Sequence, residues 1–98
     1  MALRRDEQTD TLFRSILELR DVDECYRYFE DLCTHKEIRD LGQRLTIARL
    51  LSDGSSYLQA AEQLGVSSAT IGRVKRCLDY GEGGYQMILT RLKEEEKP

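Results

Sequence analysis

Three basic residues stand close together in the second half of the chain, and no acidic residue accompanies them. Arg73, Lys75 and Arg76 lie within the segment 65–78, which contains no Asp or Glu, whereas the whole 98-residue chain has a net charge of −3. The rest of the chain therefore carries −6, so positive charge is concentrated in this segment. Because clustered cations attract the phosphates of nucleic acids, the segment is a candidate phosphate-binding surface.

Small side chains precede and interrupt this basic cluster. They allow the backbone to approach base edges closely, so bound water and DNA shape are expected to contribute to recognition. Arg76, Lys75 and the N-terminus of their helix are expected to meet phosphates, while the small residues lie nearest the bases. The predicted DNA-contacting residues are Ser67, Ser68, Ala69, Gly72, Arg73, Lys75 and Arg76.

Two short helices joined by a tight turn are predicted over about 57–78. Gly65 permits the left-handed backbone that ends a helix, Val66 fills the corner, and Ser67 is a favourable N-cap for the second helix. This pattern is typical of a helix-turn-helix whose second helix, called here the reading helix, enters the major groove of DNA. A plain helical hairpin shares the pattern. The residues expected to point inward at helical spacing are Leu58, Ala61 and Leu64, followed by Ile71, Val74 and Leu78.

Helices are predicted for the rest of the chain too, which makes it a single all-α domain over 1–98. The only proline is the last residue, and helix-forming residues are abundant. Asp21 with Glu24 and Thr34 with Glu37 have the spacing of capping boxes. Amphipathic helices are expected at about 9–19, 22–33 and 34–52. A last helix carries Tyr85, Ile88, Leu89 and Leu92 on one side and leads into a charged tail that is expected to be frayed.

The helix expected at 34–52 is apolar over more than one face, so it must be buried on several sides. In a chain this short, a second copy is the expected source of that cover. Dimerisation through helices at about 9–52 and 84–94 would place two reading helices roughly 34 Å apart, which matches a palindromic site. A monomeric helical bundle is the alternative.

Catalytic, metal-binding and membrane-spanning functions lack a sequence pattern. Cys25, Cys33 and Cys77 are an odd number without a C-x-x-C pair, which argues against disulfides and zinc. With His35 as the only histidine and no nucleophile or phosphate-loop motif, no enzyme, metal or cofactor is predicted. No apolar run approaches the roughly 20 residues that span a bilayer, and no signal-peptide core is found. A cytoplasmic protein without a membrane partner is expected.

The segments LCTHKEIRDLGQRLTIARLLSDG and LGVSSATIGRVKR resemble the Trp repressor family, and more particularly its Trp-repressor-like YerC/YecD branch. The resemblance covers about 32–78 in motif detail and the order of six helices overall. It implies an intertwined homodimer that contains a helix-turn-helix and binds a palindromic operator in double-stranded DNA. The implied function is transcriptional regulation, with repression as the expected direction.

The resemblance also implies a small amino-acid corepressor that binds between the helix-turn-helix, called here the reading head, and the core helices. The matching residues are Thr34 and Arg44 on the core side and Thr70 and Arg73 on the reading helix. Guanidinium groups stack on flat rings and pair with carboxylates in a fixed fork, which suits such a ligand. In the alternative interpretation, Arg73 contacts phosphate only and Arg44 is an ordinary surface arginine.

Two residues depart from the Trp repressor pattern. Val74 replaces the glycine that leaves room for the ligand's ring, so a corepressor other than tryptophan, or none, is expected. Gly72 replaces a threonine of the reading helix, so the operator sequence cannot be transferred. Two further alternatives follow: a ligand-independent DNA-binding dimer, and a helical protein-interaction module whose helix-turn-helix is a mimic.

Overall fold

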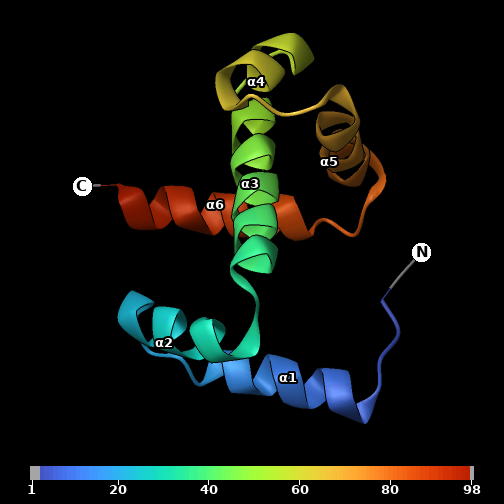
Figure 1. Ribbon diagram of the computed structural model, residues 1–98. Helices are drawn as coiled ribbons and strands as arrows, with labels where there is room; N and C mark the ends of the chain where they lie inside the picture. The colour runs from blue at the N-terminus through green and yellow to red at the C-terminus, as the bar shows by residue number, and fades with distance from the viewer. Residues whose placement is uncertain (1–2, 98) are drawn as a thin grey trace. The chain divides into compact units, whose positions relative to one another are not determined.

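The computed structural model describes residues 3–97, and the all-α prediction is confirmed for them (Figure 1). The chain forms two compact units, the first ending at Arg39 and the second beginning at Asp40. The helices are α1 (Glu7–Leu17), α2 (Val22–Leu32), α3 (His35–Ser52), α4 (Tyr57–Leu64), α5 (Ser68–Tyr80) and α6 (Gly84–Glu96).

The first unit contains α1 and α2, and neither helix has a fully buried residue. Helix α1 begins two residues earlier than predicted because the Asp6 carboxylate accepts the N–H of Thr9 at 2.8 Å. The same hydrogen bond lowers the pKa of Asp6. The helix ends at Leu17, so the predicted end at Leu19 was two residues too far. The Ser15 and Tyr28 hydroxyls, 2.6 Å apart, join α1 to α2.

One of the two predicted capping boxes is complete and the other is only half formed. At α3, the backbone N–H of Thr34 donates to Glu37 at 2.8 Å and the N–H of Glu37 donates to the Thr34 hydroxyl at 3.1 Å. Hydrogen bonding to the backbone of Thr34 lowers the pKa of Glu37. At α2, Asp21 accepts the N–H of Glu24 as predicted, but the Glu24 carboxylate accepts the N–H of Arg20 instead of that of Asp21.

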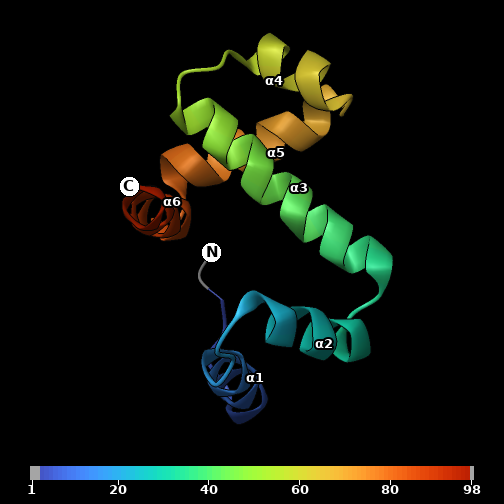
Figure 2. The same cartoon turned by 90° about the vertical axis from the view of Figure 1, so that its left-hand side faces the viewer.

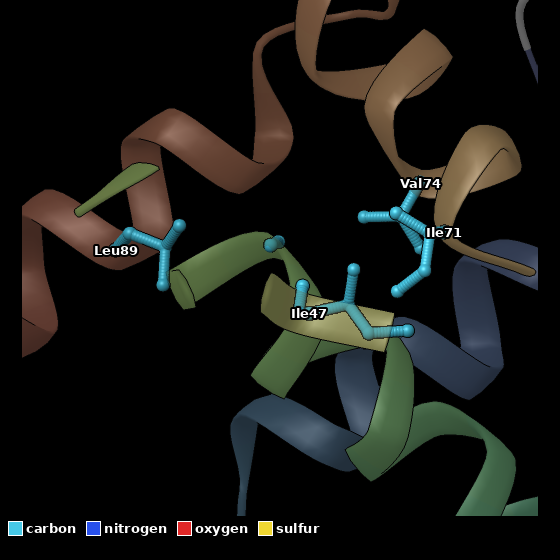
Figure 3. Close-up of a cluster of buried hydrophobic side chains, with 6 residues drawn as sticks. Ile47, Ile71, Val74 and Leu89 are labelled. Atoms are coloured by element: carbon cyan, nitrogen blue, oxygen red, sulfur yellow. The ribbon is translucent and has the colours of Figure 1, made fainter. Parts of the chain in front are cut away.

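The second unit is built around the C-terminal half of α3. Helix α4 follows the C-terminal end of α3, and α5 and α6 also pack near α3 (Figures 1 and 2). The core unites residues from all four helices, with Ile71 and Val74 directed toward Ile47 (Figure 3). Its buried members are Ile47, Ala48, Ala60, Ile71, Val74 and Leu89.

Three details of the second unit correct the sequence interpretation. Leu58 was predicted to face inward but is 66% exposed, and the neighbouring turn of α4 instead buries Ala60 completely. Ile88 is also exposed, while Leu89 beside it is buried. The charged tail is not frayed up to Glu96, because α6 continues there and ion pairs join it to the end of α3. These pairs are Arg49–Glu96 at 3.3 Å and Lys93–Asp53 at 2.9 Å.

Candidate nucleic-acid interface

The connection between α4 and α5 fixes the direction in which α5 leaves the turn. Gly65 has a φ of 64°, the left-handed conformation that glycine adopts without steric cost, and its N–H donates to the carbonyl of Ala61 at 2.9 Å. The Ser67 hydroxyl accepts the N–H of Thr70 at 3.3 Å and caps α5. The predicted turn and N-cap are therefore confirmed. The Ser56 and Gln59 capping box at α4 was missed, although its spacing is visible in the sequence.

Helix α5 has one buried face and one exposed face. Ile71 and Val74 are 0% and 2% exposed and hold the inner face against Ile47 of α3 (Figure 3). Leu78 is half-buried against the same core, as predicted. Of the residues predicted to contact DNA, the exposed ones are Ser67, Ser68, Ala69, Arg73, Lys75 and Arg76. The sequence prediction that this helix displays its basic residues outward is confirmed.

A shallow hollow of about 550 Å³ lies on the outward side of α5. Two guanidinium groups border it, together with a glycine and an alanine. Guanidinium groups bind phosphates and base edges through several donors in a rigid fork, so this hollow can hold an anion or the edge of a base. Cys77 also lines it, which the sequence did not indicate. The lining residues are Ala69, Gly72, Arg73, Arg76 and Cys77.

Lys75 is less available for binding phosphate than Arg73 and Arg76, because it forms an ion pair. Its Nζ lies 3.1 and 2.9 Å from the two carboxylate oxygens of Asp79, one helical turn further on. Helix α5 continues to Tyr80, so it includes an acid that the predicted end at Leu78 left out. Because the pair neutralises part of the charge on this face, Arg73 and Arg76 are its principal cations.

Gly72 differs from the prediction because it is half-buried by a side chain from α4. The hydroxyl of Tyr57, the first residue of α4, donates to the carbonyl of Ser68. Its oxygen lies 2.6 Å from the position that a Cβ at residue 72 would occupy. Tyr57 therefore covers part of α5, although it is a residue of α4 and lies 11 residues from Ser68 in the sequence.

The residues that the resemblance assigns to a ligand are distributed over both units. Arg44, Thr70 and Arg73 belong to the second unit, where Arg44 and Thr70 are half-buried and Arg73 is exposed. Thr34 belongs to the first unit, and its hydroxyl accepts the N–H of Glu37. The Thr70 hydroxyl lies 3.1 Å from that of Ser67. Both threonine hydroxyls thus take part in helix caps.

Tyr85 of α6 lies within electrostatic range of both arginines assigned to the ligand. Burial raises the pKa of its phenol, the charge of Cys77 raises it further, and the charges of Arg44 and Arg73 act in the opposite direction. The side chain also packs against the core that contains Val74. The two arginines therefore influence the titration of a phenol of the protein itself, an interaction that helical periodicity alone did not reveal.

Metal binding and membrane insertion find no support in the part of the chain that the structure describes. Within residues 3–97, no group of three His, Cys, Asp or Glu side chains could hold a metal ion. Over the same residues, every helix is too short or too polar to cross a bilayer.

Known proteins resemble this chain along most of its length. The family model described as Trp repressor protein matches residues 7–93. The uncharacterised protein YerC of Bacillus subtilis (strain 168) is 53% identical over 92 residues, which cover 94% of this chain and 88% of YerC. The crystal structure of a TrpR-like protein from Eubacterium eligens ATCC 27750 has a TM-score of 0.84 at 47% identity, covering 92% of this chain and 93% of that one. The crystal structure of a candidate Trp repressor from Staphylococcus aureus has a TM-score of 0.87 at 45% identity, covering 91% of this chain and 89% of that one.

Proposed function

This chain belongs to the Trp repressor family, in its YerC-like branch, and from that premise we propose that it is a sequence-specific DNA-binding transcriptional regulator that acts in the cytoplasm as a repressor. The helices α4 and α5 form its helix-turn-helix, and α5 is the reading helix. The observation that carries this proposal is that α5 has one buried face and one exposed face. Its inner face is buried through Ile71 and Val74, while Arg73 and Arg76 are presented on the outer face.

The outer face of α5 supplies both kinds of contact that DNA recognition needs. Arg76, the N-terminus of α5 and, in part, Lys75 bind phosphates, which positions the helix in the major groove. The exposed small residues Ser68 and Ala69 then lie close to base edges, so the backbone approaches the duplex and bound water bridges the remaining gaps.

A homodimer supplies the second reading helix. Large apolar side chains are exposed on α1, α2 and the first half of α3, although a monomer would gain by burying them. A second copy covers these side chains, and its two-fold symmetry matches a palindromic operator. The exposed apolar side chains are Leu12, Phe13, Leu17, Val22, Tyr26, Leu32, Ile38 and Leu41.

Salt-dependent DNA binding tests this function. Arg73 and Arg76 from each of two protomers give roughly four phosphate contacts, so the logarithm of the affinity should fall with the logarithm of salt concentration with a slope of about −4. Fluorescence anisotropy with labelled duplex, after selection of sites from random DNA, measures the slope and recovers the palindrome. A flat salt profile without a selected sequence would favour the helical protein-interaction module instead.

The matched variant for this titration is Asp79→Asn. Removing the carboxylate releases Lys75 from its ion pair, so the salt slope should steepen by up to about 0.9 for each protomer and low-salt affinity should rise. Lys75→Ala should show the opposite, smaller change, because the lysine is already neutralised in part. An unchanged slope in Asp79→Asn would mean that Lys75 does not face the duplex.

The burial of Val74 favours ligand-independent DNA binding over control by a small amino-acid corepressor other than tryptophan. Its isopropyl group occupies the space that a ligand's ring would need in the corepressor interpretation, in which Thr34, Arg44, Thr70 and Arg73 contact the ligand.

Calorimetric titration with each of the amino acids should therefore give no heat of binding in the wild-type protein. Operator affinity should also stay unchanged at millimolar amino-acid concentrations. Saturable binding of one amino acid, abolished in Arg44→Ala, would instead establish the corepressor site.

A further inference from the structure

Tyr57 is attached to the reading helix by a contact that leaves much of its ring exposed. Its hydroxyl donates to the Ser68 carbonyl in the first turn of α5, and the side chain remains 42% exposed. A carbonyl oxygen has two lone pairs, so this bond is compatible with the helical hydrogen bond of α5. Because the hydroxyl has one hydrogen, it cannot also donate to a phosphate or a base. A base contact made by Tyr57 must therefore use its ring or the acceptor capacity of its oxygen.

Gly72 makes this position of the ring possible. A Cβ at residue 72 would lie 2.6 Å from the tyrosine oxygen and 3.7 Å from the ring carbon that bears it, and the first distance is closer than non-bonded atoms tolerate. Glycine inside a helix costs about 1 kcal/mol relative to alanine. The close approach of Tyr57 gives this destabilising residue a structural purpose: the phenol oxygen lies where a side chain at position 72 would begin, and the ring lies next to it at ordinary contact distance.

The Tyr57 side chain therefore lies beside the position at which the reading helix lacks a side chain. Gly72 borders the hollow on the outward side of α5, together with Ala69 and Arg73. Short side chains at Ser68 and Ala69 let the duplex come near, and the half-exposed Tyr57 side chain stands beside Gly72 and the first turn of α5. An exposed apolar edge in the major groove complements the C5-methyl group of thymine.

We propose that Tyr57 is a specificity-determining residue of the reading head, whose ring contacts a thymine methyl group in each half-site in place of the side chain that Gly72 lacks. This inference rests on the proposed DNA-binding function. It adds a residue of α4 to the base-reading surface, which otherwise consists of α5 alone.

The test removes the methyl group of one thymine at a time from the DNA. Sites are selected from random DNA with the full-length wild-type protein, and each selected thymine is then replaced by uracil, which lacks only the methyl group. At one position in each half-site, the wild-type affinity should fall about fourfold, the value of one buried methyl group. Tyr57→Ala should bind the thymine and uracil duplexes equally, and selection with this variant should lose the thymine preference at that position only.

Two further variants separate contact from folding. Tyr57→Phe keeps the ring and should retain sensitivity to the methyl group. Gly72→Ala restores a good helix former but requires the Tyr57 hydroxyl to move, so it should weaken the same thymine preference while the protein remains folded by circular dichroism.

The outcomes distinguish this inference from the function on which it rests. If the wild-type protein selects a sequence but Tyr57→Ala keeps the full methyl sensitivity, Tyr57 only positions α4 and the inference is overturned. If the wild-type protein selects no sequence, the proposed function itself fails, and the inference fails with it.

Discussion

Arg73→Ala is expected to weaken binding to the selected DNA site by at least about thirtyfold. Loss of a guanidinium that contacts a base or phosphate costs about 1–3 kcal/mol, and a dimer carries the substitution twice. Arg73 is exposed and borders the hollow of α5 next to Arg76, without the intrahelical ion pair that occupies Lys75. Fluorescence anisotropy at fixed salt concentration measures the loss.

Two variants serve as controls for Arg73→Ala. Arg73→Lys keeps the charge but lacks the planar fork, so it should preserve the salt slope while recovering only part of the affinity. Arg44→Ala removes a half-buried arginine of α3 and should leave ligand-free DNA affinity within about twofold, because its charge is not on the outer face of α5. Equal losses in Arg73→Ala and Arg44→Ala would contradict this division.

Ile47→Ala is expected to destabilise the protein by about 2–5 kcal/mol, which is a large part of the roughly 5–15 kcal/mol that holds a typical domain folded. Ile47 is completely buried, and Ile71 and Val74 of the reading helix are directed toward it (Figure 3). The cavity would remove both apolar burial and the support of the inner face of α5. The midpoint of thermal unfolding should fall by roughly 10 to 30 °C.

The matched control is Leu58→Ala, which removes a similar apolar side chain from an exposed position of α4. Its effect should stay within about 0.5 kcal/mol. Both variants must be compared with the wild type at one protomer concentration, because the stability of a dimer depends on concentration. A shift in Ile47→Ala no larger than that in Leu58→Ala would show that Ile47 does not hold the core together.

Local chemistry made the α4–α5 connection predictable from the sequence. Gly65 and Ser67 act through their own backbone and the next three residues, so their roles as turn and N-cap can be read from neighbouring letters. Ile71 and Val74 follow the helical period, and that period identifies their buried face. Leu58 was misassigned because several rotations of an eight-residue helix give similar apolar faces, and packing selected the one that buries Ala60.

The helical repeat of apolar residues could not predict contacts between side chains of different helices. Tyr57 reaches α5 across the turn, and Tyr85 of α6 packs against the core that contains Val74 of α5. No spacing rule links these positions. The pairing of Lys75 with Asp79 was missed for a simpler reason, because α5 was predicted to end one residue before the acid. The dimer, the ligand site and the single-domain organisation over 1–98 stay predictions.

The shared space of Tyr57 and Gly72 constrains the order in which mutations can accumulate in this lineage. A side chain acquired at position 72 requires the Tyr57 hydroxyl to move, whereas prior replacement of the tyrosine by a smaller residue removes that contact. The two positions should therefore vary together among descendants of a common ancestor. A change of operator would then follow a two-step route, with the aromatic residue exchanged before the glycine.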